Sequence, residues 1–172
     1  MDNLRLVEGW IRLALEDWRL IESIDYTRYK GATVYHAQQF VEKLCKAIIA
    51  ALGFEPPKTH KPSWEIDSIL TDIRLGNVKL SIDSEVIELL EKMSALAKTL
   101  EDEGTRPRYG VRHRDGIIPP DDYYSIDHVK LLLNDAIYIA GLTLMVLTKL
   151  NYCSKLTEIC GELSAIREKR LG

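Results

Sequence analysis

The chain has 172 residues, of which 46% are hydrophobic and 28% charged, a composition typical of one globular domain with or without an appendage and unlike that of a disordered segment. The formal net charge of −3 argues against non-specific binding of polyanions by the whole surface, so any contact with nucleic acid has to be local. The N-terminus lacks the features of a secretory signal, and the longest apolar run, 136–147, is shorter than the ~20 residues that a membrane span needs. We therefore expect a cytoplasmic protein with no membrane association.

The first part of the chain predicts two amphipathic helices. In residues 3–25 apolar side chains recur at alternating steps of three and four, which is the helical period, and charged side chains lie on the opposite side. A second apolar stripe over residues 34–48 predicts another helix. This helix should end near Gly53, because glycine favours a helix C-terminus and Pro56 cannot continue the helix.

The middle of the chain predicts two more helices and a long loop. Residues 63–75 carry a shorter apolar pattern, and Ser81 or Asp83 offers an N-cap for a helix that reaches about Leu100. No periodicity appears over residues 101–124. A loop of roughly 20 residues is long for a compact domain, and such loops are usually functional or mobile.

Two helices are predicted in the last part of the chain. Ser125 should cap a helix that reaches about Leu150 and is apolar nearly all round from Ala136, which indicates a helix at the centre of a bundle or one covered by a partner chain. Residues 154–170 form a clean amphipathic pattern that predicts a last helix, which packs back on the bundle or dimerises.

These patterns predict an all-α fold, because no alternating strand pattern appears. We expect an up-and-down antiparallel bundle of about five core helices over residues 1–150, followed by a C-terminal amphipathic helix over residues 151–172. The three cysteines, Cys45, Cys153 and Cys160, fall inside helical patterns without a C-x-x-C pair, so we expect buried free thiols.

Metal and cofactor motifs are missing from the sequence. Di-iron bundles need Glu-x-x-His, and none of the residues three positions before the four histidines is acidic; they are Thr33, Pro57, Gly110 and Ser125. No zinc-protease, P-loop or hydrolase motif occurs either. We therefore predict no metal and no cofactor.

Three of the histidines are expected to be structural. His36 lies at the start of the second predicted helix and is interpreted as a capping or surface residue. His60 is interpreted as a loop histidine that bonds to local backbone, and His128 as exposed or bonded to neighbouring aspartates.

The segment 105–115, T-R-P-R-Y-G-V-R-H-R-D, is the best candidate for a functional site. Proline and glycine keep it from being a helix interior, and binding residues concentrate on loops held by rigid elements. Its cationic side chains are Arg106, Arg108, Arg112, Arg114 and His113. They either bind a phosphate-bearing partner or form salt bridges with the acids at positions 101–103, 121 and 122.

Arg108 and His113 make the minimum pair for phosphodiester transfer without a metal. A histidine can take or give a proton near neutral pH, and the fork of an arginine suits phosphate oxygens. In RNA, the base would deprotonate the 2′-hydroxyl beside the scissile phosphate. The pattern R-x-x-x-x-H alone is weak and occurs by chance.

Several stretches together resemble one family. Residues 36–49, H-A-Q-Q-F-V-E-K-L-C-K-A-I-I, resemble the second-helix signature of HEPN domains, and Thr59-His60 resembles the loop before the family's next helix. Arg108-Tyr109, followed by P-P-D-D-Y at 119–123 and an alanine-rich helix, looks like the family's arginine-tyrosine segment and last core helix. The likeness covers about residues 4–150.

The resemblance implies a five-helix up-and-down bundle that usually forms a homodimer, with the loop motif near the dimer cleft. In catalytic HEPN members an R-x4-6-H motif cuts RNA without metal, and Arg108 and His113 match its spacing. Arg108 would then orient the phosphate and His113 would act as base or acid. The expected phosphate- or nucleotide-binding residues around them are Arg106, Tyr109, Arg112 and Arg114.

Three hypotheses follow. The first is a toxin-like, metal-independent endoribonuclease that works through Arg108 and His113. The second is a non-catalytic module that binds a nucleotide or a partner and works with a separately encoded nucleotidyltransferase. The third is a structural adaptor whose cationic loop only forms salt bridges.

Overall fold

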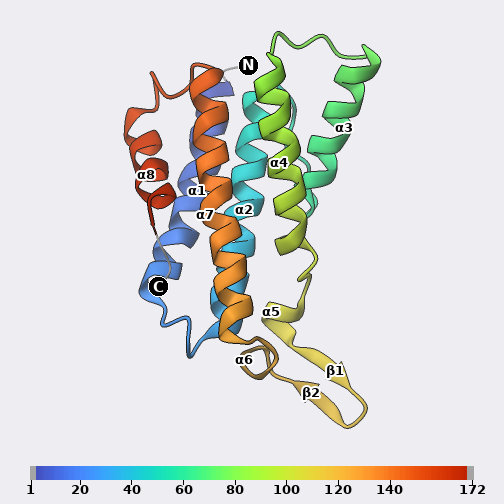
Figure 1. The fold of residues 1–172 in the computed structure, drawn as a ribbon, viewed down its shortest axis with the longest axis vertical. Coiled ribbons are helices and arrows are strands. Elements are labelled where there is room, and N and C mark those ends of the chain that lie inside the picture. Colours follow the sequence, from blue (N-terminus) through green and yellow to red (C-terminus); the bar gives the residue numbers. More distant parts are fainter. Residues whose placement is uncertain (1–2, 170–172) are drawn as a thin grey trace.

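Four long helices form the centre of the molecule in the computed structural model, which describes residues 3–169 (Figure 1). They are α1 (Asn3–Ser23), α2 (Lys30–Ala51), α4 (Ser84–Glu101) and α7 (Ile126–Lys149). α3 (Pro62–Leu75) packs against α4 and α2, and α8 (Thr157–Arg167) packs against α7 and α1. The predicted all-α, up-and-down bundle of about five core helices with an extra C-terminal helix is confirmed.

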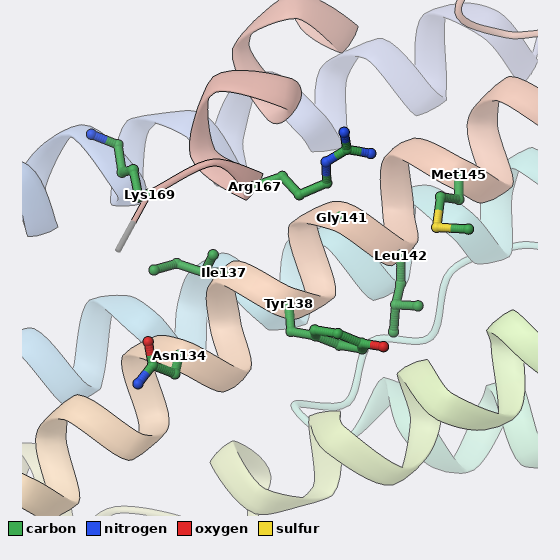
Figure 2. A pocket seen from close by; sticks show the side chains of 8 residues that line it. All are labelled: Asn134, Ile137, Tyr138, Gly141, Leu142, Met145, Arg167 and Lys169. Atoms are coloured by element: carbon green, nitrogen blue, oxygen red, sulfur yellow. The ribbon is translucent and has the colours of Figure 1, made fainter. Parts of the chain in front are cut away.

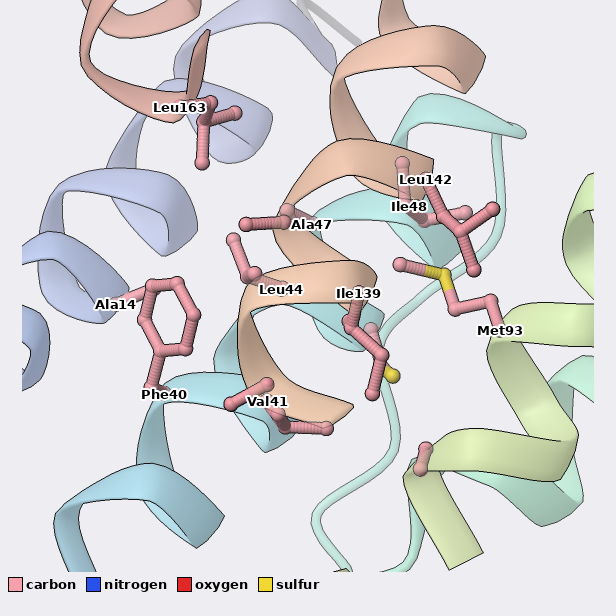
Figure 3. Close-up of a cluster of buried hydrophobic side chains, with 14 of the residues drawn as sticks. Ala14, Phe40, Val41, Leu44, Ala47, Ile48, Met93, Ile139, Leu142 and Leu163 are labelled. Carbon is pink, nitrogen blue, oxygen red and sulfur yellow. The ribbon is translucent and has the colours of Figure 1, made fainter. Parts of the chain in front are cut away.

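The core lies where α2 meets α1, α4 and α7 (Figure 3). Phe40 and Leu44 of α2, Met93 of α4 and Ile139 of α7 are all completely buried, and Leu163 adds α8 to the same cluster. The predicted α2 stripe is therefore buried, and the helix is apolar on more than one face because it has neighbours on several sides.

α7 is the helix that the sequence predicts to be apolar all round. It is the one helix of the described residues that is long and apolar enough to cross a membrane, but 61% of its most apolar window is buried inside the bundle. A helix in the core of a bundle can be as long and as apolar as a membrane-spanning helix, so these two properties alone are weak evidence for a membrane span. Three large side chains on one face of α7 stay exposed: Leu131, Tyr138 and Met145.

Two helix starts are fixed by the caps that the sequence predicts. The Asp83 carboxylate accepts a hydrogen bond from the Val86 amide at 2.8 Å at the start of α4. The Ser125 hydroxyl accepts one from the His128 amide at 3.1 Å at the start of α7. Each bond satisfies a backbone donor that has no partner within the helix.

The expectation of a strand-free, irregular loop over residues 101–124 is wrong. The segment contains α5 (Arg106–Tyr109), a hairpin of β1 (Val111–His113) and β2 (Gly116–Ile118), and α6 (Pro120–Tyr123). Strands of three residues are too short to show an alternating pattern. Figure 1 shows the hairpin extending from one end of the bundle.

Two of the cysteines also differ from the prediction. Cys153 and Cys160 form a disulfide, with their Cα atoms 5.7 Å apart. α8 begins at Thr157 and not near residue 154, so Cys153 lies in the turn before the helix and meets Cys160 in its first turns. Cys45 is a buried free thiol, as expected, and burial raises its pKa well above the usual range.

Candidate functional site

The cationic segment is anchored to the bundle through one buried carboxylate, Glu103. The Tyr124 hydroxyl donates a hydrogen bond to Glu103 at 2.8 Å, and His128 Nε2 lies 3.2 Å from the same carboxylate. Arg106 Nε lies 3.3 Å from it. Burial, together with Glu103, raises the pKa of Tyr124, so this hydroxyl remains a donor. These contacts fix the end of α4 and the start of α5 against the first turn of α7.

The hairpin after α5 carries two arginines and a histidine away from this anchor. Arg112 pairs with Ile117 and His113 with Gly116 in the antiparallel register, and Arg114 lies in the turn. All three side chains are exposed. Gly110 makes the turn into the hairpin at a φ of 70°, which L side chains rarely adopt.

Arg108 faces a different environment, a small pocket between α2, the start of α3, the end of α4 and α5, whose lining residues are mainly of polar and charged types. The cavity has a volume of about 160 Å³. Its lining residues are Tyr35, Gln38, Gln39, Glu42, His60, Lys61, Glu101, Gly104, Thr105 and Arg108. We call it the Arg108 pocket. It joins parts of the chain that lie up to about seventy positions apart in sequence.

Two aromatic rings hold the Arg108 guanidinium. Its central carbon lies 5.5 Å from the centre of the Tyr35 ring and 5.3 Å from that of Tyr109, distances that allow cation–π attraction. Within residues 3–169 no carboxylate lies within the 4.0 Å of a salt bridge from this guanidinium. Its hydrogen-bonding fork therefore remains available to a ligand.

Gln38 positions the segment that carries Arg108. Its side-chain amide donates to the backbone carbonyls of Leu100 at 3.0 Å and Gly104 at 3.1 Å. These bonds tie the middle of α2 to the turn between α4 and α5. The wall of the pocket is thereby fixed to the most deeply buried helix of the bundle.

A carboxylate and an imidazole form the opposite wall. Glu42 of α2 lies 3.1 Å from His60 Nδ1 and accepts a hydrogen bond from Lys46 at 2.8 Å. The side chain of Glu42 is 8% exposed and that of His60 is 80% exposed. His60 therefore does not bond local backbone as the sequence interpretation expects. Its partner is eighteen positions away, a separation that gives no sequence signal.

Glu101 is the second carboxylate of the pocket. It accepts hydrogen bonds from the Ser63 amide, at 3.0 Å, and from the Ser63 hydroxyl. Burial raises the pKa of Glu101 above its ordinary value, against the lowering effect of the two bonds. Glu101 thus closes the pocket by joining the end of α4 to the start of α3.

The structure separates the residues of the predicted site. Arg108 lines the pocket and Tyr109 packs beside it, whereas Arg106 is paired with Glu103. Arg112, His113 and Arg114 lie on the hairpin and are not among the lining residues. Among the described residues of this chain, the histidine that lines the Arg108 pocket is His60.

His36 also has a buried partner, in contrast to the capping or surface role interpreted from sequence. Its Nδ1 lies 2.9 Å from the carboxylate of Asp17 in α1, and Lys43 bonds the same carboxylate. The side chain of His36 is mostly buried. This cluster joins α1 to α2 and has a structural role.

A second cavity, of about 310 Å³, lies between α7 and α8 (Figure 2). Its lining is mainly apolar, with Ile137, Tyr138, Leu142 and Met145 on α7 and Arg167 at the end of α8. It offers apolar contact area but no carboxylate or imidazole. In residues 3–169 no group of three or more His, Cys, Asp or Glu side chains is arranged to hold a metal ion.

Comparison with known proteins identifies the family. Residues 7–142 match the family described as HEPN domain, a span that runs from α1 into α7 and includes the whole Arg108 pocket. No curated protein and no solved structure matches the chain. Because the match covers most of the sequence and the fold is the helical bundle that the resemblance implies, the chain belongs to the HEPN domain family.

Proposed function

We propose that this HEPN protein binds the phosphodiester backbone of RNA at the Arg108 pocket. The observation that carries the proposal is the Arg108 guanidinium, which lines a cavity and has no carboxylate partner in residues 3–169. Lys46 compensates the charge of Glu42, and Ser63 donates two hydrogen bonds to Glu101. A phosphate entering the pocket therefore meets Arg108 and Lys61 as its nearest cations.

The size of the pocket favours an RNA backbone over a free nucleotide. At about 160 Å³ it is smaller than the ~300 Å³ at which pockets for whole small molecules begin. The exposed Arg112 and Arg114 on the hairpin can contact neighbouring phosphates of a chain but not those of a single nucleotide inside the pocket.

Binding of a labelled single-stranded RNA, followed by fluorescence anisotropy, tests this proposal. Arg108→Ala should weaken binding ~10-fold or more, because hydrogen bonds to charged groups contribute about 1.5–3 kcal/mol. Arg5→Ala is the matched control, because it removes an exposed arginine in the first turn of α1, and Figure 1 shows the N-terminus at the end of the bundle opposite to the hairpin. Equal affinities for the Arg108→Ala protein, the Arg5→Ala protein and the wild type refute the proposal. Titration with ATP in place of RNA tests the alternative, a nucleotide site.

A second candidate function is the metal-independent endoribonuclease that works through Arg108 and His113. The R-x4-H spacing within a HEPN protein favours it. Because His113 is on the hairpin and outside the pocket lining, this pair requires the hairpin of a second protomer or a different hairpin position. A mixture of Arg108→Ala and His113→Ala proteins tests shared sites, since randomly mixed dimers regain about one quarter of the wild-type activity.

We also propose the assemblies that the family resemblance implies, a cytoplasmic homodimer and a nucleotidyltransferase partner. Leu131, Tyr138 and Met145 recur at seven-residue steps on the exposed face of α7, which supports a protein contact there. Light scattering of the purified protein gives the molar mass, and Tyr138→Lys should lower it from that of a dimer to that of a monomer.

A further inference from the structure

We infer that His60 and Glu42 form the proton-transfer pair of the Arg108 pocket, which makes His60 a catalytic residue and Glu42 the residue that positions it. The inference rests on the proposed binding of RNA in that pocket. His60 Nδ1 lies 3.1 Å from Glu42 Oε2 and 3.3 Å from Oε1. Both residues line the same cavity as Arg108.

The geometry sets the tautomer of His60. An ionised carboxylate only accepts hydrogen bonds, so His60 Nδ1 carries a proton and donates the hydrogen bond to Glu42. The lone pair then resides on Nε2, the atom that can act as a base. The exposed His60 side chain leaves this second nitrogen accessible to a ligand. A buried carboxylate that orients an imidazole in this way also stabilises the imidazolium after proton uptake.

Glu42 is itself held in place. Lys46 donates to Glu42 Oε1 at 2.8 Å, and the ammonium group of Lys46 lies 5.1 Å from the centre of the Trp10 ring. Gln39 donates to Oε2 at 3.4 Å, the oxygen nearer to His60. The carboxylate therefore has a fixed position on α2, although the imidazole that it contacts lies on a loop.

A structural role alone does not explain why the His60–Glu42 pair lies at the Arg108 pocket. Most surface ion pairs contribute ~0–1 kcal/mol, and an imidazole as exposed as His60 gains little stability from one. The placement of the imidazole on the rim of a cavity that also holds an unpaired guanidinium is the feature that chemistry requires. His113 lacks it, since it lies on the hairpin outside this cavity.

The reaction is transfer of an RNA phosphodiester to its own 2′-oxygen. His60 Nε2 takes the proton of the 2′-hydroxyl, the 2′-oxygen forms a bond to phosphorus, and the bond from phosphorus to the 5′-oxygen breaks. The leaving 5′-oxygen takes a proton from water, and the imidazolium then returns its proton to solvent. The products are a 2′,3′-cyclic phosphate and a 5′-hydroxyl, and Arg108 faces the charge that builds on the phosphate oxygens.

Cleavage of a 5′-labelled RNA with EDTA present tests the inference. The wild type should produce a 2′,3′-cyclic phosphate end, and a substrate with 2′-deoxyribose at the cleaved position should remain intact. His60→Ala should lower the cleavage rate ~10²–10⁴-fold, the usual contribution of a general base, without weakening RNA binding. Thr59→Ala is the matched control, because it truncates the exposed neighbouring side chain and should cleave like the wild type.

Glu42 needs a variant that keeps the fold, because Glu42→Gln alone leaves the buried Lys46 without its carboxylate partner. We therefore pair Glu42→Gln with the double variant Glu42→Gln/Lys46→Met. Both should lower kcat with little change in KM, and both should alter the acidic side of the rate–pH profile. The charged groups that line the pocket with His60, and so affect this profile, are Glu42, Lys61, Glu101 and Arg108.

The outcomes separate this inference from the binding proposal. If RNA binds in an Arg108-dependent manner but the wild type does not cleave, or His60→Ala cleaves at the wild-type rate, the His60–Glu42 inference is wrong and the binding proposal stands. If only His113→Ala abolishes cleavage, the R-x4-H pair is the catalytic one and the inference is also wrong. If Arg108→Ala binds RNA like the wild type, the proposed function fails and this inference fails with it.

Discussion

Two arginines only two positions apart have different roles in this structure. Arg106 Nε lies 3.3 Å from the buried Glu103, whereas Arg108 lies over Tyr35 and lines a cavity. Arg106 matches the salt-bridge interpretation of the cationic segment. Arg108 has no carboxylate partner in residues 3–169, and its phosphate-binding interpretation stays a prediction. The helical turn of α5 makes the difference, because it points neighbouring side chains in different directions.

Glu101 gives a prediction at the scale of a single residue. Burial raises its pKa, so the folded chain binds this proton more tightly than the unfolded chain does. The protonated Glu101 carboxyl group therefore contributes its full stabilisation below the pKa of ~4.3 that it has in the unfolded chain. This contribution is lost as the pH rises through the pKa of Glu101 in the folded chain. We predict that Glu101→Gln gains stability relative to the wild type as the pH rises from the unfolded pKa of ~4.3 through the raised pKa of the folded state.

Urea unfolding at a series of pH values measures this difference in the free energy of unfolding. Glu55→Gln is the control, since Glu55 is an exposed glutamate on the loop between α2 and α3 and should show no such trend. A constant difference between Glu101→Gln and the wild type across the pH range contradicts the prediction. The hydrogen bonds from Ser63 affect the size of the difference but not its sign.

At the scale of elements, the sequence predicts the long helices and misses the short ones. Period and caps are sufficient for α1, α2, α4 and α7, because each buries a stripe or is apolar all round over many turns. The segment 105–124 carries no period, since its helices have four residues and its strands three. Its shape depends on tertiary contacts such as those of Glu103.

Gly110 gives a prediction for the hairpin. A Cβ at this position would lie 2.1 Å from the Ile118 carbonyl oxygen, and the φ of 70° disfavours any L side chain. Gly110→Ala should therefore destabilise the hairpin by ~1–3 kcal/mol, the usual cost of a strained backbone conformation. Trypsin cleavage after Arg112 and Arg114 should become faster than in the wild type.

Gly9→Ala is the matched control for this substitution. Gly9 is an exposed helical residue with no atom near the added Cβ, so alanine there should leave the cleavage rate unchanged. An equal cleavage rate for Gly110→Ala and the wild type would show that β1 and β2 do not need this turn.

At the scale of the whole molecule, the site combines segments that sequence patterns treat separately. The family motif leads to Arg108, and the structure adds Gln38, Glu42 and His60 from α2 and the loop before α3. The packing of α2 against α3 and α5 brings them together, and no local period encodes that packing. For this reason the sequence points to the separate family-like stretches but does not show that Glu42 and His60 meet Arg108 at one cavity.

The role of α8 is the last prediction. The family match ends at residue 142, and the sequence separates residues 151–172 as an extension, but Ile159, Leu163 and Ile166 are almost fully buried against α7 and α1. Each buried leucine or isoleucine contributes ~1.5–3 kcal/mol. A chain of residues 1–150 should therefore lose several kcal/mol of stability and expose apolar surface of α7 and α1.

Urea unfolding of the shortened chain beside the full chain measures this loss, and two point variants identify its cause. Leu163→Ala should cost ~2–5 kcal/mol because it leaves a cavity in the core. Glu162 lies beside Leu163 on α8, and Glu162→Ala removes only its exposed salt bridge to Arg19 of α1. This variant should cost less than ~1 kcal/mol. If residues 1–150 unfold at the same urea concentration as the full chain, α8 is an appendage and its burial adds nothing to the stability of the HEPN bundle.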